Sequence, residues 1–201
     1  MVNFSRLRIP VGAVAVVLVM SSWPASADDV TDAVEEALQF YKDGKYTEAA
    51  SSLNYAAQLV QQKKGASMES LLPEPLDGWT AEEASSQSAG TAMFGGGLTA
   101  ERRYVKDQST VNIQIVTDSP LLQSMMMMMA NPMFATSSGG KLETINGQKA
   151  IVKLNPNDRS GQIQIVVANR FLVTLDGAEV TRDDVVAYAK AIDYGKMAAL
   201  P

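Results

Sequence analysis

Alternation of apolar and polar residues with a period of two is the feature that most constrains the fold of this chain. Within 110–118, Val111 and Ile113 alternate with Asn112 and Gln114, a pattern typical of a β-strand with one buried face and one solvated face. Several neighbouring segments repeat the pattern, and the residues between some of them have a helical period instead. A chain of this kind buries one sheet face under helices, so we expect an α+β fold with an antiparallel sheet.

The order of the expected elements is β-β-β-α-β-β-β-β-α. The expected strands are Trp79–Ala84, Leu98–Lys106, Thr110–Asp118, Leu142–Ile145, Gln148–Leu154, Gly161–Ala168 and Phe171–Leu175. The dipeptide Asn146-Gly147 is a strong hairpin signal. Thr181 and Asp184 form a capping box that opens the final helix, whose inward-facing residues are Val185, Ala189 and Ile192.

Before the sheet, residues 28–72 are expected to form two helices. Apolar residues recur there at helical spacing on both sides of a break at Gly44. The pattern Ala37-x3-Tyr41-x2-Gly44-x-Tyr46-x2-Ala49 resembles the helix pair of a tetratricopeptide repeat. A repeat array needs about three such units to bury its faces. The apolar faces of this single hairpin must therefore be buried against another surface.

We expect three residues of this hairpin, Leu38, Leu53 and Val60, to be buried against the rest of the protein or against a second subunit. The second arrangement would be a homodimer through the helical hairpin. Pro73, Pro75 and Gly78 then form a stiff connector. The expected organisation is thus a helical hairpin (28–72), a linker (73–78) and an α/β domain (79–201).

Three short motifs in the second part carry a resemblance to a known family. They are Gly78-Trp79, Asn146-Gly147-Gln148-Lys149-Ala150 and the closing Ala189-Lys190-Ala191-Ile192-Asp193. Together with the element order, they make Leu76–Leu200 resemble the PsbP-like α/β fold, which PsbP, Mog and the DcrB-type envelope lipoproteins share. The resemblance implies a fold and a non-enzymatic role. Unlike the bacterial lipoproteins, this chain has no lipidated Cys and carries the hairpin.

The N-terminal 27 residues are expected to be a cleaved secretory signal. Arg6 and Arg8 supply its positive charge, Val11–Met20 its apolar segment, and Ala25-Ser26-Ala27 a small-x-small cleavage site. The apolar run is shorter than the roughly 20 residues that span a bilayer. The chain is therefore expected to be a bacterial periplasmic or secreted protein, with no stable membrane anchor.

Composition excludes several kinds of chemistry. The chain has no Cys and no His, so catalytic triads that use His, Cys nucleophiles and zinc sites with these ligands are absent. Without residues 1–27 it has 15 basic and 22 acidic residues, a net charge of −7, which argues against nucleic acid as a partner. Glu82 and Glu83 would point to opposite faces of a strand and form no catalytic pair. We therefore expect no enzymatic activity.

The stretch Ser119–Phe134 contains five consecutive methionines. Ser119 and Pro120 are a helix start signal. The residues expected to face the sheet are Leu121, Leu122, Met125, Met128 and Met129. Met126 and Met127 would then point away from the sheet, where a helix that only covers a sheet carries polar residues.

This excess of exposed apolar residues predicts a binding surface. The expected loop Ser85–Gly97 also carries two apolar residues, Met93 and Phe94, near its end. The expected surface consists of Met93, Phe94, Met126, Met127, Met133 and Phe134, and the expected partner is an envelope protein or a hydrophobic small molecule. No cofactor is expected. The alternative is a periplasmic Cu(I)-handling protein in which the thioethers of Met125, Met128 and Met129 bind copper.

Overall fold

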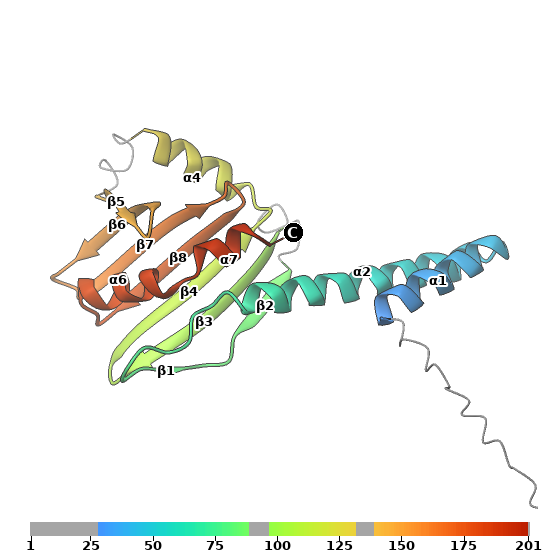
Figure 1. Ribbon diagram of the computed structural model, residues 1–201, viewed down its shortest axis with the longest axis horizontal. Coiled ribbons are helices and arrows are strands. Elements are labelled where there is room, and N and C mark those ends of the chain that lie inside the picture. The colour runs from blue at the N-terminus through green and yellow to red at the C-terminus, as the bar shows by residue number, and fades with distance from the viewer. Residues whose placement is uncertain (1–27, 89–96, 132–138, 201) are drawn as a thin grey trace, which may run out of the picture.

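The computed structural model describes residues 28–88, 97–131 and 139–200, and the chain has the expected α+β architecture (Figure 1). Two antiparallel helices, α1 (Asp29–Lys42) and α2 (Tyr46–Glu69), precede an antiparallel sheet. The strands of the sheet are β1 (Thr80–Ala81), β2 (Ser85–Ser88), β3 (Leu98–Lys106), β4 (Ser109–Thr117), β5 (Lys141–Ile145), β6 (Gln148–Asn155), β7 (Ser160–Val167) and β8 (Phe171–Ala178). The other helices are α4 (Leu121–Ala130), α6 (Arg182–Ala191) and α7 (Tyr194–Ala198). The expected export signal, residues 1–27, lies outside the described residues.

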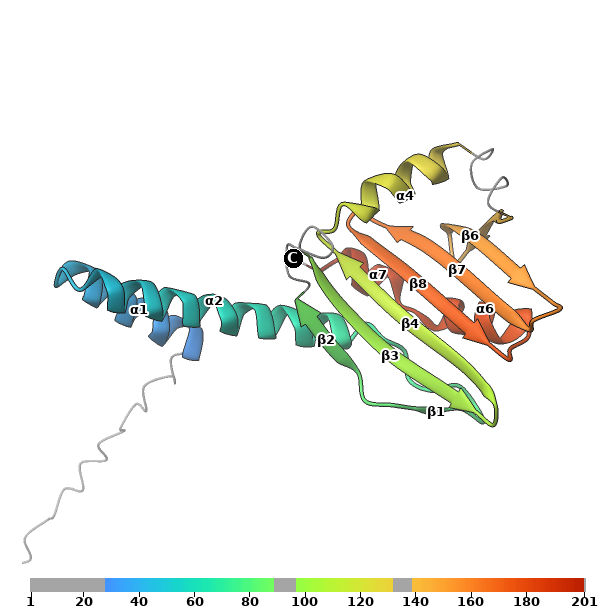
Figure 2. The same cartoon turned by 180° about the vertical axis from the view of Figure 1, so that it is seen from behind.

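The described strands form one sheet in the order β1-β3-β4-β8-β7-β6-β5, and β2 also pairs with β3. The chain leaves β4 through α4 and then builds β5 to β8 as successive hairpins, so that β8 returns beside β4 (Figure 2). Asn146 and Gly147 have positive φ angles of 45° and 79°, the left-handed conformation that a two-residue hairpin turn requires. The predicted β5–β6 hairpin is therefore confirmed.

One face of the sheet holds the core, and α6, α7 and the C-terminal turns of α2 cover it (Figure 1). The inward residues of the central strands are fully buried, as their period of two predicts: Val111, Ile113, Ile115, Ile163, Ile165, Val173 and Leu175. The other face carries mostly polar side chains, except where α4 crosses β6 and β7. The sheet is thus covered by helices on one face and largely open on the other.

The capping box that opens α6 forms as expected. The Thr181 hydroxyl accepts a hydrogen bond from the Asp184 backbone N–H, and the Asp184 carboxylate accepts one from the Thr181 backbone N–H. Val185, Ala189 and Ile192 are buried, so the inward face of this helix is confirmed. Ile192 lies just past the last helical residue.

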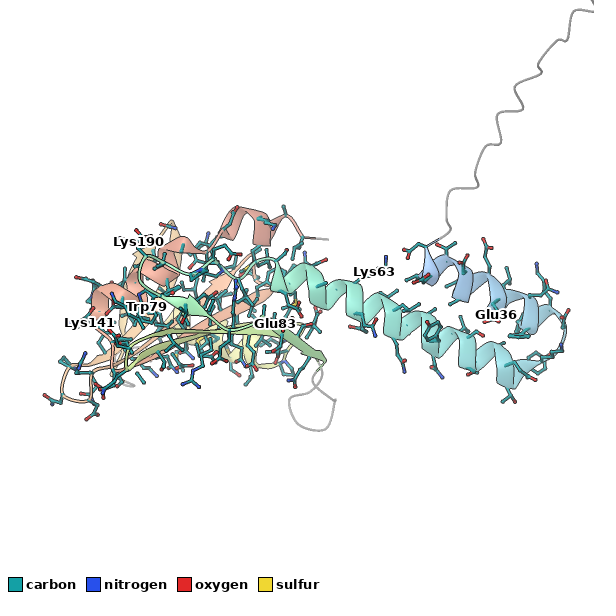
Figure 3. All side chains as sticks on the ribbon, turned by 90° about the horizontal axis from the view of Figure 1, so that it is seen from below. Glu36, Lys63, Trp79, Glu83, Lys141 and Lys190 are labelled. Carbon is teal, nitrogen blue, oxygen red and sulfur yellow. The ribbon has the colours of Figure 1, made fainter. Side chains whose placement is uncertain are left out.

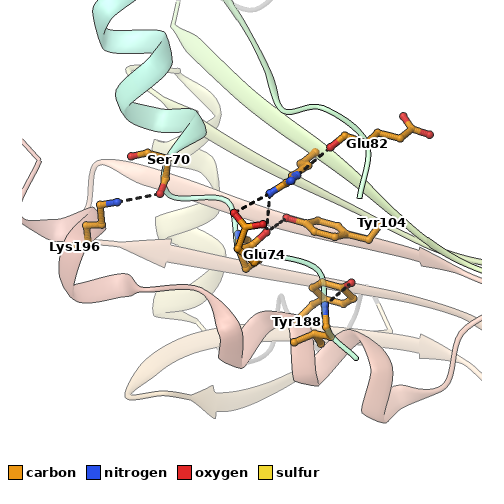
Figure 4. Close-up of polar contacts among 9 residues, drawn as sticks. Ser70, Glu74, Glu82, Tyr104, Tyr188 and Lys196 are labelled. Atoms are coloured by element: carbon orange, nitrogen blue, oxygen red, sulfur yellow. Dashed lines mark hydrogen bonds and ion pairs between the residues drawn. The ribbon is translucent and has the colours of Figure 1, made fainter. Parts of the chain in front are cut away.

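The connector between α2 and β1 is bonded to the α/β part of the protein. The Pro73 carbonyl accepts hydrogen bonds from the Tyr104 hydroxyl at 2.7 Å and from the Arg102 guanidinium at 3.2 Å (Figure 4). The Leu76 backbone N–H donates to the Tyr188 hydroxyl at 3.4 Å. The segment 73–78 is therefore held against β3 and α6 along its length.

Three tyrosines lie in this core, and their buried hydroxyl groups make the free energy of unfolding depend on pH in the alkaline range. Burial is the main cause that raises the pKa of Tyr104, Tyr188 and Tyr194 above the ordinary value of a phenol. Above about pH 10, the unfolded chain loses these protons more readily than the folded protein does. Their contribution to stability is therefore fully present below about pH 10 and is lost as the pH rises further.

We expect the free energy of unfolding, measured by urea denaturation, to fall as the pH rises above about 10. The Tyr188→Phe variant should show a shallower fall, because one of the three phenols is gone. A free energy that stays constant between about pH 8 and 11 would contradict this assignment of buried phenols.

Small residues form the contact between α1 and α2. Ala33, Ala37, Ala49 and Ala56 are buried there, and small side chains let two helices approach closely. The base of the hairpin is closed by an ion pair between Asp28 and Lys63 at 2.9 Å. The predicted helical hairpin is confirmed.

The expected burial of Leu38, Leu53 and Val60 against the α/β domain is wrong. These residues are 52%, 54% and 48% exposed. The physical reason is that only the C-terminal turns of α2 reach the sheet, while α1 packs along the distal part of α2 (Figures 1 and 2). Burial against a second subunit stays a prediction.

Two strand boundaries near the hairpin also differ from the expected ones. Trp79–Ala84 was expected to be a strand, but only Thr80–Ala81 pairs with β3, and Trp79 is buried in the core. Conversely, the segment expected to be a loop, Ser85–Gly97, begins with the strand β2. Serine-rich sequence has little strand propensity, so β2 exists because the edge of β3 supplies hydrogen-bond partners.

Gly65 lies inside α2 and is buried where the helix meets β2. A Cβ at this position would lie 2.4 Å from the Ser86 Oγ.

In a free helix, a Gly-to-Ala change stabilises by about 1 kcal/mol. Here we expect Gly65→Ala to lower the free energy of unfolding by about 1 kcal/mol, because the contact overrides propensity. In a Ser86→Gly background the same change should stabilise the protein. Stabilisation by Gly65→Ala alone would show that α2 docks differently.

Candidate binding site

The methionine helix α4 begins at Leu121, one residue later than expected, with Pro120 and not Ser119 at the N-cap position. The Ser119 hydroxyl accepts a hydrogen bond from the Leu121 backbone N–H at 3.3 Å, and Ser119 itself is buried. The helix then crosses β6 and β7 on the face of the sheet opposite to α6 (Figure 2).

The side of α4 that faces the sheet is rotated from the expected one. Leu122 and Met129 are buried, but Leu121 is half exposed, so its expected contact with the sheet is wrong. The buried face is centred on Leu122 and Met129, a rotation of roughly 50° at 100° per residue. This rotation turns Leu121 away from the sheet and brings Met126 towards it.

The three candidate copper ligands all contribute to packing. Met129 is buried against Ile151, and Met125 and Met128 pack beside it at the edge of the same small cluster, together with Leu142 and Val166. Apolar packing therefore accounts for Met125, Met128 and Met129, since thioether side chains fill irregular gaps well.

Of the six residues expected to form the binding surface, the structure describes two. Met127 is 68% exposed on the outer side of α4, and Met126 is half-buried. Met93, Phe94, Met133 and Phe134 lie outside the described residues.

Met126 lines a groove of about 370 Å³ between α4 and the turns at the end of the sheet. We call it the Met groove. It is lined by Met126, Met129, Ala130, Gly147, Gln148, Lys149, Val166, Ala168 and Asn169. Met129 is the most buried residue of its lining, and the rim is formed by the exposed Lys149 and Asn169 together with the half-buried Gln148, which supply one ammonium group and two amide side chains. Such a groove can hold one apolar side chain or ring beside an acceptor or an anionic group.

The turn residues of the Met groove could not be found from sequence reasoning. Gly147, Gln148 and Lys149 belong to the β5–β6 hairpin, whereas Ala168 and Asn169 form the β7–β8 turn with positive φ angles of 50° and 53°. The Asn146-Gly147 signal locates one turn, but only the tertiary fold brings both turns beside α4.

A second hollow, of about 490 Å³, lies on the open polar face of the sheet. Its charged lining residues are Glu82, Glu83, Glu101, Arg102, Arg103 and Asp176. Because β1 ends at Ala81, Glu82 and Glu83 do not belong to a strand as expected, and both are among the lining residues of this hollow. Within the described ranges, no three acidic side chains are grouped so that they could hold a metal ion. Mixed charges at an exposed surface indicate no specific chemistry.

The largest exposed apolar side chains of the described residues gather on the helical hairpin. Six of them, which we call the hairpin face, are 45–67% exposed: Val34, Leu38, Tyr41, Tyr46, Leu53 and Val60. The rings of Tyr41 and Tyr46 contact each other at 5.7 Å between centroids, so the two helices contribute to one surface at the tip.

Comparisons with known proteins do not assign this chain to a protein family. No family model, curated protein or solved structure matches it. In the part of the chain that the structure describes, none of the helices has the length and apolar character needed to cross a membrane. The fold defines an α+β protein, and its described part carries two exposed apolar surfaces, one on α4 and one on the helical hairpin.

Proposed function

We propose that this protein is an exported, non-enzymatic binding protein that holds an apolar group of a protein partner or of a hydrophobic small molecule in the Met groove. The observation that carries the proposal is the Met126–Met127 pair. Met126 lines the groove, and its neighbour Met127 is exposed on the outer side of α4, next to the groove in sequence but not part of its lining. An exposed Met gains nothing in water, whereas burial of the side chain contributes about 1.5–3 kcal/mol.

The chemistry of the groove supports a ligand with two parts. The thioethers of Met126 and Met129 are flexible and polarisable, so they adapt to apolar groups of different shape. At the rim, Lys149 can pair with a carboxylate or another anionic group, and the amides of Gln148 and Asn169 can bond to a peptide backbone. An extended peptide that ends in, or presents, one apolar side chain fits this description.

Two sequence features support the rest of the proposal. The signal-like segment 1–27 supports export to the periplasm or out of the cell, and the absence of Cys is compatible with an oxidising compartment. The resemblance to the PsbP-like fold favours an accessory role, and the antiparallel sheet with helices is the arrangement that this resemblance implies.

The double variant Met126→Gln, Met127→Gln tests the groove. The probe is an anilinonaphthalene sulfonate dye, which combines apolar rings with an anionic group. We expect its affinity to fall at least about fivefold, a loss of about 1 kcal/mol, while the free energy of unfolding changes by less than about 1 kcal/mol.

Leu121→Gln is the matched control, because Leu121 is an exposed apolar residue of the same helix outside the groove. It should leave dye binding unchanged. If both variants weaken the dye equally, or if the double variant loses several kcal/mol of stability, the groove is not the binding site.

Copper handling is the second candidate, because Met126 and Met129 line the same groove one helical turn apart and thioethers are soft ligands for Cu(I). The double variant Met126→Leu, Met129→Leu separates the two functions. An apolar-binding protein retains the dye after this change, whereas a copper-binding protein loses Cu(I) affinity. A wild-type protein without Cu(I) affinity excludes the copper function.

A further inference from the structure

The hairpin face is at least as large as the largest apolar patches that monomers normally expose. Its six side chains leave on the order of 700 Å² accessible, judged from their exposed fractions, whereas the largest patch on a typical monomer is about 300–600 Å². If two copies covered this area on each other, they would bury roughly 1,400 Å², within the range of specific protein interfaces.

The geometry of the helices places these residues on one side of the hairpin. At 100° per residue, Val34, Leu38 and Tyr41 of α1 fall on the same side as Leu53 and Val60 of α2. The ring contact between Tyr41 and Tyr46 agrees with this placement. The face is therefore a continuous stripe that runs along both helices.

Charge is nearly absent from this side. Asp29, Asp32 and Glu36 of α1 and Glu48 of α2 all fall on the other side of the hairpin. Of the charged residues in the two helices, Lys64 lies within the arc of the face, at its base, where it pairs with Asp118. A neutral face on a chain of net negative charge favours an occupant that is itself neutral and apolar there.

The hairpin extends away from the sheet, so nothing in the described part of the protein covers the face (Figure 3). Two hairpins whose apolar sides meet would form a four-helix bundle, the usual way in which such helices bury their stripes. With the two copies antiparallel, the sheets lie at opposite ends of the bundle and do not collide.

The antiparallel arrangement also matches large side chains of one copy with a small side chain of the other. The bulky tip of one copy, with Tyr41 and Tyr46, meets the smaller Val60 at the base of the other. We propose that two copies of this chain pair through the hairpin face in this two-fold arrangement, with Leu53 of each copy facing the same residue of the other.

Sedimentation of the purified protein tests the proposal. We expect twice the monomer mass at tens of micromolar, and a dimer dissociation constant at least about tenfold weaker for Leu53→Glu, because the two-fold axis then places two carboxylates together. Ser51→Glu adds the same charge to an exposed residue of α2 outside the face and should leave the dimer intact. A mixture of the Leu53→Glu and Leu53→Lys variants should recover the dimer.

Three outcomes would overturn the proposal. The first is a wild-type protein that is monomeric at these concentrations. The second is equal weakening by Leu53→Glu and Ser51→Glu. The third is a monomer that binds vesicles of neutral phosphatidylcholine through the face, which would make a lipid surface the occupant.

Because position 53 is half exposed, Leu53→Glu should keep the wild-type unfolding midpoint of the monomer, and a large drop would equally contradict an exposed face.

Discussion

Replacement of Tyr188 by alanine is expected to lower the free energy of unfolding by about 3–5 kcal/mol. The side chain is fully buried and joins three parts of the protein. Its ring packs edge-on against Trp79, with 5.2 Å between centroids, and at a tilt of 43° against Tyr104, with 4.5 Å between centroids. Its hydroxyl accepts a hydrogen bond from the Leu76 N–H. The truncation leaves a cavity where α6, β3 and the connector meet. Chemical denaturation measures the change.

Two control variants separate packing from the hydroxyl group. Tyr188→Phe keeps the ring and should cost only about 1 kcal/mol, since it removes one long hydrogen bond. Tyr55→Ala removes a tyrosine that is 55% exposed on α2 and should change stability by less than about 0.5 kcal/mol. If Tyr188→Ala costs no more than Tyr188→Phe, the aromatic cluster does not hold the connector to the sheet.

The second large effect is expected at Gly177 in β8. Gly177 and Gly161 are direct partners across β7 and β8, and the absence of both side chains leaves room for Val185 of α6. A Cβ at position 177 would lie 2.6 Å from the Val180 Cγ2 and 2.9 Å from the Val185 Cγ2. We expect Gly177→Val to lower the free energy of unfolding by about 2–3 kcal/mol, because α6 must move away from the sheet.

A compensating change tests this reason. Gly177→Ala should destabilise the wild-type protein, and the loss should be smaller in a Val185→Ala background, where part of the obstruction is gone. In a strand interior without such neighbours, alanine is better than glycine by about 0.5–1 kcal/mol. A stabilising Gly177→Ala variant would therefore show that α6 does not approach the sheet this closely.

The sequence alone was sufficient for features that depend on local periodicity and local capping. The alternation of Val111 and Ile113 with Asn112 and Gln114 determined which residues of β4 enter the core. The Asn146-Gly147 turn and the capping box at Thr181 and Asp184 form as expected, since each is decided within a few residues. Together with the helical spacing of apolar residues on both sides of Gly44, these signals determined the α+β class and the helical hairpin.

For the candidate site, the sequence determined that α4 carries more methionine than a covering helix needs. It did not determine the rotation of α4, so Leu121 was expected at the sheet and Met126 away from it. That rotation depends on the shape of the surface formed by Ile151 and Val166, which is assembled from strands far along the chain. The rim of the Met groove has the same origin, because it combines two distant turns.

Only the tertiary structure decided what covers each apolar stripe and where short polar strands form. The sequence showed that Leu38, Leu53 and Val60 lie on apolar stripes, but a helical period carries no information about which surface will face it. In the folded protein the connector is bonded to Tyr104 and Arg102, so the hairpin points outward. The strand β2 forms because β3 offers unpaired backbone groups. Local pattern determines which side of an element is apolar, and long-range packing determines its partner.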